Sequence, residues 1–116
     1  MQCGNEYTIC CQQYASFSLL ITWLDENGSP VDLSGYSAAM QVRFAPGGYL
    51  LIELTNSNGM ITLGGTAGTV LLIISAAKTT LFAPGAYHYD ILLTSAGGVA
   101  TRLLEGSFYV EAGITP

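Results

Sequence analysis

The stretch Trp23-Leu24-Asp25-Glu26-Asn27-Gly28-Ser29-Pro30-Val31-Asp32-Leu33-Ser34-Gly35-Tyr36 decides the fold, because it contains the end of one strand, a turn and a connector. Alternating apolar and polar residues lead into it and end at Asp25. Asn27-Gly28 is a turn signal, since both residue types tolerate backbone angles that other residues avoid. The connector at residues 30–36 then leads into a second alternating segment. Such alternation is typical of half-buried antiparallel strands.

The same two-residue period continues outward along the whole chain. It predicts strands at residues 16–25, 37–44, 49–55 and 86–94. A continuous β-branched and leucine run predicts a central strand at residues 69–75, and further strands are expected at residues 7–12, 60–63 and 101–111. Glycine-rich turns separate these segments, and Gly106 predicts a bulge or bend in the last one. One short helix is predicted at residues 75–82, with Ser75 as its cap and Pro84-Gly85 ending it. The sequence therefore predicts an all-β, antiparallel sandwich of about seven strands with at most one short helix.

The predicted domain covers residues 1–116, with its core at about residues 6–112. Within it, Trp23 is expected to be buried between the sheets, together with Phe17, Ile21, Met40 and Tyr89. Phe44 is expected to face inward at the end of its strand, because it continues the alternation of Ala38, Met40 and Val42.

Several apolar residues occupy the nominally outward positions of these strands, where polar residues are expected in a lone sandwich. They are Leu20, Leu24, Leu51, Leu71, Ile73 and Leu92. Some of them could lie under loops, and together they could form a second apolar surface for a neighbouring subunit. They are the candidate interface residues.

Charged residues are few, at 9% of the chain, whereas half of the residues are hydrophobic. A typical soluble domain carries about 25% charged residues, so either the surface consists of hydroxyls and glycine or much of it lies against other subunits. The net charge is −5 and the only basic residues are Arg43, Lys78 and Arg102. Binding to nucleic acid or to an anionic membrane needs clustered cations, so neither is expected. The longest apolar run, residues 70–74, is too short to span a bilayer, and no signal-peptide pattern is visible.

The three cysteines, Cys3, Cys10 and Cys11, do not form a closed disulfide framework because their number is odd. Their spacing fits no zinc pattern, and further ligands are missing. Reduced thiols that act as small hydrophobic residues are expected, which suits assembly in the cytosol.

No catalytic set is apparent in the sequence, so the protein is expected not to be an enzyme and to need no cofactor. His88 is the only histidine, it lies on the outward side of its strand beside Asp90, and no nucleophile motif accompanies it. Asp25, Glu26, Asn27 and Asp32 surround one turn, which makes calcium binding conceivable. Their spacing is not that of an EF-hand loop and these residues are ordinary turn formers, so no metal is expected.

The opening stretch, extended through Met40-Gln41-Val42-Arg43, resembles the first strand pair of small structural domains of tailed bacteriophages. The similarity continues in Ile52-Glu53-Leu54-Thr55 and in Pro84-Gly85 through Ile91, and it covers roughly residues 16–112. The first motif also resembles, more loosely, the N-terminal domain of siphophage upper-baseplate proteins. The resemblance implies an immunoglobulin-like β-sandwich in a virion, with Tyr36 packed at the sandwich end, and it carries over no catalytic residue. The segment at residues 4–13 departs from the family pattern, so its strand pairing is left open.

The function expected from these observations is that of a non-enzymatic virion structural protein, assembled in the host cytoplasm in many copies. Its partners would be copies of itself and other virion proteins, in a symmetric homo-oligomer. A tail, baseplate or fibre-adaptor position and a capsid-decoration position are both open. The alternative function is that of a carbohydrate- or receptor-binding module, which would show exposed aromatic residues at one loop end.

Overall fold

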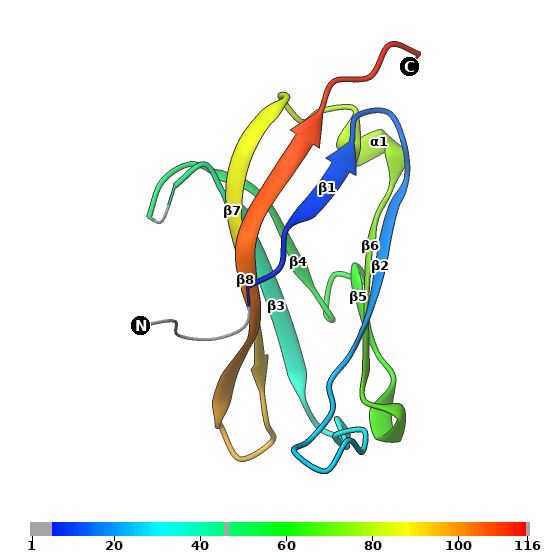
Figure 1. Ribbon diagram of the computed structural model, residues 1–116, viewed down its shortest axis with the longest axis vertical. Helices are drawn as coiled ribbons and strands as arrows, with labels where there is room; N and C mark the ends of the chain where they lie inside the picture. The colour runs from blue at the N-terminus through cyan, green and yellow to red at the C-terminus, as the bar shows by residue number, and fades with distance from the viewer. Residues whose placement is uncertain (1–5, 46, 116) are drawn as a thin grey trace.

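Eight β-strands form two sheets that face each other in the computed structural model, which describes residues 6–45 and 47–115 (Figure 1). The five-stranded sheet contains, in spatial order, β1 (Ile9–Gln12), β8 (Ala100–Glu111), β7 (Gly85–Thr94), β3 (Ser37–Arg43) and β4 (Leu50–Thr55). The three-stranded sheet contains β2 (Phe17–Thr22), β6 (Thr69–Ile74) and β5 (Ile61–Leu63). The predicted β-sandwich is therefore confirmed.

The core lies between the two sheets and consists of the inward residue of each alternating pair. On β7 these are Tyr87, Tyr89, Ile91 and Leu93, and all of them are buried as the alternation predicts. The other buried members come mainly from β3, β6 and β8: Ala38, Met40, Val42, Val70, Leu72, Ile74, Leu103, Phe108 and Val110. The period of two therefore predicted the buried side of the strands wherever their register is continuous.

Phe44 is the exception, and its predicted inward position is wrong. β3 ends at Arg43, and the side chain of Phe44 is 64% exposed. The backbone N–H of Phe44 donates to the carbonyl of Tyr49, which starts the turn between β3 and β4. The ring of Phe44 therefore makes a T-shaped contact with the ring of Tyr87, with the centroids 6.3 Å apart, instead of entering the core.

Trp23 lies just beyond the end of β2 and is half-buried, not enclosed between the sheets as expected. Its ring packs edge-on against that of Tyr36, with the centroids 6.1 Å apart. The connector places Leu33 at this end of the sandwich, fully buried, where its N–H donates to the carbonyl of Gly65. The expectation that Tyr36 packs at the sandwich end is confirmed.

β1 is parallel to β8, whereas every other strand pair is antiparallel. The pairing of this first strand, which the sequence left open, is therefore parallel, and the rest of the sandwich is antiparallel as expected. The chain leaves the five-stranded sheet after Gln12 and enters the three-stranded sheet at Phe17, so β1 has no hairpin partner next to it in sequence. It pairs instead with the last strand, with Ile9 opposite Phe108.

Gly106 makes room for the segment that precedes β1. A Cβ atom at Gly106 would collide with the carbonyl oxygen of Tyr7. The Tyr7 N–H donates to the carbonyl of Glu105 over 2.9 Å, and the Tyr89 hydroxyl donates to the carbonyl of Tyr7 over 2.6 Å. Of the predicted bulge or bend, a bulge at Gly106 is ruled out, because Gly106 pairs in register with Tyr89; the register of β7 and β8 shifts at Leu103 instead.

The helix α1 (Ala76–Thr79) is shorter than predicted and connects β6 in one sheet with β7 in the other. Ser75 stands at its N-cap position, but its side chain makes no capping hydrogen bond. The buried hydroxyl of Thr79 donates to the carbonyl of Ala15, which attaches the helix to the connection between β1 and β2. A single 3-10 turn at Gly65–Ala67 precedes β6. No helix in residues 6–45 and 47–115 is long and apolar enough to cross a membrane.

Candidate functional site: an apolar face and a polar depression

The outward side of the three-stranded sheet carries exposed apolar side chains and no charge. The strands β2, β5 and β6 contain no Asp, Glu, Lys or Arg. Leu20 lies directly opposite Leu71 in the β2–β6 register, and Ile73 follows Leu71 two residues along β6 on the same side. Leu20 is 60% exposed and Ile73 is 41% exposed. We call Leu20, Leu71 and Ile73 the apolar face.

Three of the six candidate interface residues form this face, and the other three lie elsewhere. Leu24 is beyond the end of β2, in a short hairpin where it is paired with Pro30. Leu92 is half-buried on the outward side of the five-stranded sheet, opposite Ala39. Leu51 stands at a register shift between β3 and β4 and packs against the core, so Leu50 is the exposed residue there. The six residues therefore do not form one surface.

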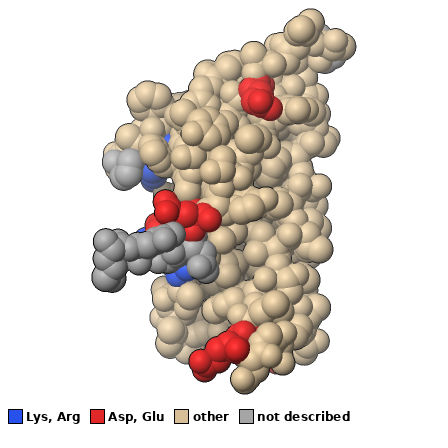
Figure 2. All heavy atoms as spheres, viewed as in Figure 1, with Lys and Arg blue, Asp and Glu red and all other residues tan. Residues whose placement is uncertain are grey.

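Charged residues gather instead on the outward side of the five-stranded sheet. They surround a depression of about 610 Å³ whose lining residues include Glu6, Arg43, His88, Asp90, Arg102 and Glu105. Two of the three basic residues of the chain lie in this polar depression. Figure 2 shows acidic and basic atoms at mid-height on this side of the molecule, and none along the opposite side where β2 and β6 lie.

The cations of the polar depression are already partnered within the chain. The Arg43 guanidinium donates to the side-chain oxygen of Gln41 and to the carbonyl of Gly48. Arg102 Nε lies 3.2 Å from a carboxylate oxygen of Asp90, and both side chains are about half exposed. Such exposed pairs contribute little to stability. They leave no strong excess of positive charge that would attract an anion.

Sequence reasoning placed His88 on the outward side of its strand, beside Asp90, but it did not predict the depression. The signal was the alternation that puts Gln41 and Arg43 on one side of β3 and His88 and Asp90 on one side of β7. The register joins them, because Arg43 lies opposite His88 and Gln41 lies opposite Asp90. Which strands are neighbours is a property of the sheet, and the alternation within a single strand does not contain it.

His88 lies near two groups with which it could in principle act chemically. It is opposite Ser107 in the β7–β8 register and two residues before Asp90 on the same side of β7. Within the described residues, no hydrogen bond joins His88 to either group, and Asp90 pairs with Arg102 instead. A base that activates a nucleophile needs such a bond, directly or in the substrate complex. The expectation that the protein is not an enzyme stays a prediction.

The acidic turn considered for calcium uses its carboxylates to hold the turn itself. Asp25 Oδ1 accepts hydrogen bonds from the backbone N–H groups of Asn27 and Ser29. Asp32 Oδ1 accepts from the N–H of Ser34, and hydrogen bonds from the side chain and then the backbone of Ser34 lower the Asp32 pKa. Within residues 6–45 and 47–115, no three His, Cys, Asp or Glu residues are grouped to hold a metal ion.

The cysteines divide between the two sides of β1. Cys11 is buried, and burial raises the pKa of its thiol to about 11, whereas Cys10 is exposed. Neither forms a disulfide in the described part of the chain. The third cysteine, Cys3, lies outside the described residues, so the expectation that its thiol is reduced is not tested.

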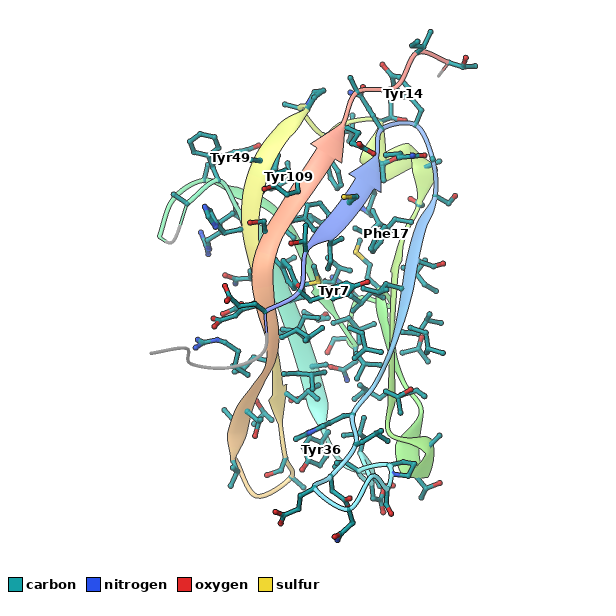
Figure 3. The ribbon with its side chains drawn as sticks, viewed as in Figure 1. Tyr7, Tyr14, Phe17, Tyr36, Tyr49 and Tyr109 are labelled. Carbon is teal, nitrogen blue, oxygen red and sulfur yellow. The ribbon has the colours of Figure 1, made fainter. Side chains whose placement is uncertain are left out.

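The tyrosines of β7 are core residues, as expected, and both of their hydroxyls are satisfied. Tyr87 Oη donates to the carbonyl of Ala83 over 2.7 Å, and Tyr89 Oη donates to Tyr7. Burial raises the pKa of both phenols. Other aromatic side chains are exposed: Phe44 and Tyr49, which is 70% exposed, flank the β3–β4 turn. Figure 3 shows Tyr49 on this turn, projecting away from the body of the sandwich.

The fold and the two surfaces define the class of protein: a β-sandwich domain. No protein-family model matches the chain, and no curated protein matches it either. Its fold is similar to that of the N-terminal domain of phage TP901-1 ORF48, with a TM-score of 0.53, 16% identity, and 92% of this chain and 98% of that domain covered. It is also similar to CopC from Methylosinus trichosporium OB3b, with a TM-score of 0.50, 14% identity, and 93% and 89% covered. At these identities the similarity shows the fold alone.

Proposed function

We propose that this protein is a non-enzymatic structural subunit of a tailed-bacteriophage virion, present in many copies and packed against copies of itself and other virion proteins. The observation that carries the proposal is the apolar face, Leu20, Leu71 and Ile73, on a sheet whose strands contain no charged residue. Large contiguous apolar patches are rare on soluble monomers and usually mark an interaction site.

The distribution of charge supports the same proposal. The chain has eight acidic and three basic residues, and none of these lies in β2, β5 or β6. One sheet therefore has a polar, hydrated outward side and the other has an apolar one. A subunit within a particle needs this division, because one side is covered by neighbours while the other remains in water.

The phage assignment rests on the resemblance of residues 16–112 to small phage structural domains. The similarity of the fold to a phage protein domain is compatible with it. Tail, baseplate and fibre-adaptor positions and a capsid-decoration position are all consistent with a small β-sandwich of this kind. Assembly would take place in the host cytoplasm, where the buried thiol of Cys11 stays reduced.

The proposal is tested by separating purified virions into heads and tails and measuring this protein in each fraction by quantitative mass spectrometry. Many copies in one fraction are expected, and the fraction decides between capsid and tail. Particles produced without the protein should lose stability or infectivity. Its absence from purified virions, or particles that are unchanged without it, would refute the structural role.

A binding module for carbohydrate or a receptor is the second candidate, and the exposed aromatic rings of Phe44 and Tyr49 favour it. Aromatic rings at a loop end can stack on sugar rings. No Asn or Asp flanks them in the turn, which contains only Ala, Pro and Gly. Binding to host cells that Tyr49→Ala abolishes would support this function. Leu81→Ala is the control, because Leu81 is a large apolar side chain that is also mostly exposed, on a different loop.

A further inference from the structure

The two sheets leave a groove along one side of the sandwich, between the edge strands β1 and β2. The groove has a volume of about 380 Å³ and is lined by residues of the β1 segment, such as Tyr7 and Ile9, and of the β2 segment, such as Phe17 and Leu19. Figure 3 labels Tyr7 and Phe17, which lie on its two sides. On the opposite side of the sandwich, the edge strands β4 and β5 are joined directly by a turn in which Asn58 bonds to three backbone groups.

The backbone of β2 presents unpaired hydrogen-bonding groups toward this open side. Trp23 N–H donates to the carbonyl of Gly68, so the odd-numbered residues of β2 face β6. The N–H of Ile73 donates to the carbonyl of Met60, just before β5, so the backbone groups of the odd-numbered residues of β6 bond toward β5. Those of the even-numbered residues therefore bond toward β2, which independently gives the same result. The N–H and C=O groups of Ser18, Leu20 and Thr22 therefore point away from β6. No other part of the described chain pairs with them.

β2 is also the one edge strand in the described residues that lacks the usual protection against pairing. Edge strands of soluble proteins are normally short, charged, bulged or interrupted by proline. β5 has three residues, β1 has four, and β4 carries Glu53 and the register shift at Leu51. The six residues of β2, Phe-Ser-Leu-Leu-Ile-Thr, contain no charge and no proline, and their register with β6 is continuous.

We propose that β2 pairs edge to edge with β2 of a second copy of this chain, antiparallel and about a two-fold axis at Leu20. This pairing joins the two three-stranded sheets into one sheet of six strands. It places Leu20 opposite Leu20 of the second copy, and Ser18 opposite Thr22 of the second copy. By symmetry, Thr22 also lies opposite Ser18 of the second copy. Each of these three pairs of opposite residues exchanges two backbone hydrogen bonds, which gives about six in total. The inference rests on the proposed function, because it names the self-contact through which the subunit assembles.

The distribution of charge favours a second copy of this chain as the partner that pairs with the edge of β2. Two copies of this chain both carry a net charge of −5, with eight acidic and three basic residues, so self-contacts that include charged residues tend to oppose like charges. β2 avoids this repulsion, because its nearest charged neighbour in sequence, Asp25, would lie opposite Ala15 of the second copy. The inward Ile21 of the second copy lies beside Leu19, over the groove. The two apolar faces also become continuous across the axis.

The register of the proposed β2–β2 pairing determines which substitutions test it. Ser18 and Thr22 are exposed and far apart within one β2 strand, but they are opposite each other across the proposed axis. The variant S18K/T22K places lysine opposite lysine, whereas S18E/T22K places glutamate opposite lysine at the same two positions. The control T62K/I73K adds two lysines to the outward side of the same sheet on β5 and β6, so neither stands on the free edge, although Ile73 lies opposite Ser18 in the β2–β6 register.

Sedimentation velocity over a concentration series, together with amide hydrogen exchange, measures the result. The wild type, S18E/T22K and T62K/I73K are expected to form dimers, with slowed exchange at residues 18, 20 and 22. S18K/T22K is expected to sediment as a folded monomer. The pairing is refuted if the wild type stays monomeric up to millimolar concentration, if S18K/T22K still dimerises, or if these three amides exchange freely in the dimer. Loss of association only in T62K/I73K would refute the edge contact while leaving a subunit role through the apolar face.

Discussion

Gly106→Ala tests whether β8 holds the N-terminal segment as the structure describes. A Cβ atom at this position would lie 3.1 Å from the carbonyl carbon and 3.2 Å from the nitrogen of Tyr7, and closer still to its carbonyl oxygen. These atoms are backbone, and they are held on both sides by hydrogen bonds with Glu105 and Tyr89. The segment before β1 therefore has to move away from β8 to accommodate the methyl group.

The size of the effect follows from what that movement breaks. Two hydrogen bonds are lost or weakened, at about 1 kcal/mol each. Ile9, which is buried against the core, is partly uncovered, and its full burial is worth about 2 kcal/mol. The free energy of unfolding should therefore fall by about 2 to 4 kcal/mol, beyond any cost from the backbone angle itself. With a urea m-value of about 1.5 kcal/mol/M, the unfolding midpoint should fall by about 2 M.

Two control variants separate the collision from other effects of alanine. Gly85 has the same φ of 155° as Gly106, but a Cβ there meets only a ring carbon of Tyr87 at 3.9 Å. Gly85→Ala therefore measures the cost of the backbone angle alone. Gly97 has no left-handed φ, and a Cβ there meets only the Ser95 hydroxyl oxygen, at 3.9 Å, so Gly97→Ala should change stability by less than about 0.5 kcal/mol. Urea unfolding followed by tryptophan fluorescence measures all three variants.

The reactivity of Cys11 reports on the position of β1 directly. Its thiol should stay protected in the wild type and in Gly85→Ala, and it should react readily in Gly106→Ala. If Gly106→Ala and Gly85→Ala have the same stability within about 0.5 kcal/mol, or if Cys11 stays protected in both, the parallel pairing of β1 with β8 is refuted.

Three further predictions follow from burial and charge. Phe108→Ala should lower the free energy of unfolding by about 3 to 5 kcal/mol, measured in urea, because the Phe108 side chain is fully buried. Trp23→Ala should lower it by less, because Trp23 is half-buried at the sandwich end. Equal losses in the two variants would contradict these placements. At pH 8, alkylation followed by peptide mapping should label the exposed Cys10 quickly. The buried Cys11, whose pKa is raised to about 11, should be labelled only after denaturation. Equal labelling of the two thiols would refute the burial of Cys11. The pKa of Asp32 is lowered in the folded state, so this carboxylate contributes stability that is fully present above the ordinary carboxyl pKa and is lost as the pH falls through the folded-state pKa. Asp32→Asn should therefore make the melting temperature less dependent on pH below about 4. An unchanged pH profile would count against the hydrogen bonds from Ser34 as the cause.

Several structural features could be predicted from the sequence because they are local. Alternation within one strand determines which side chains share a side, so Tyr87, Tyr89, Ile91 and Leu93 were identified as buried before any strand had a partner. The turn at Asn27-Gly28 and the short helix after Ser75 are likewise properties of a few consecutive residues. Leu20, Leu71 and Ile73 could be identified as outward and apolar for the same reason.

The tertiary structure alone decided which of these sides lie together. Nothing in residues 7–12 shows that β1 pairs in parallel with β8, about 100 residues away, because this pairing depends on where the chain changes sheet. A one-residue register shift turned Leu51 toward the core and left Leu50 exposed, and the early end of β3 left Phe44 in solvent. The polar depression and the apolar face exist only because particular strands are neighbours. A period of two determines the two sides of each strand, but strand order and register arise from contacts between segments that are distant in the sequence.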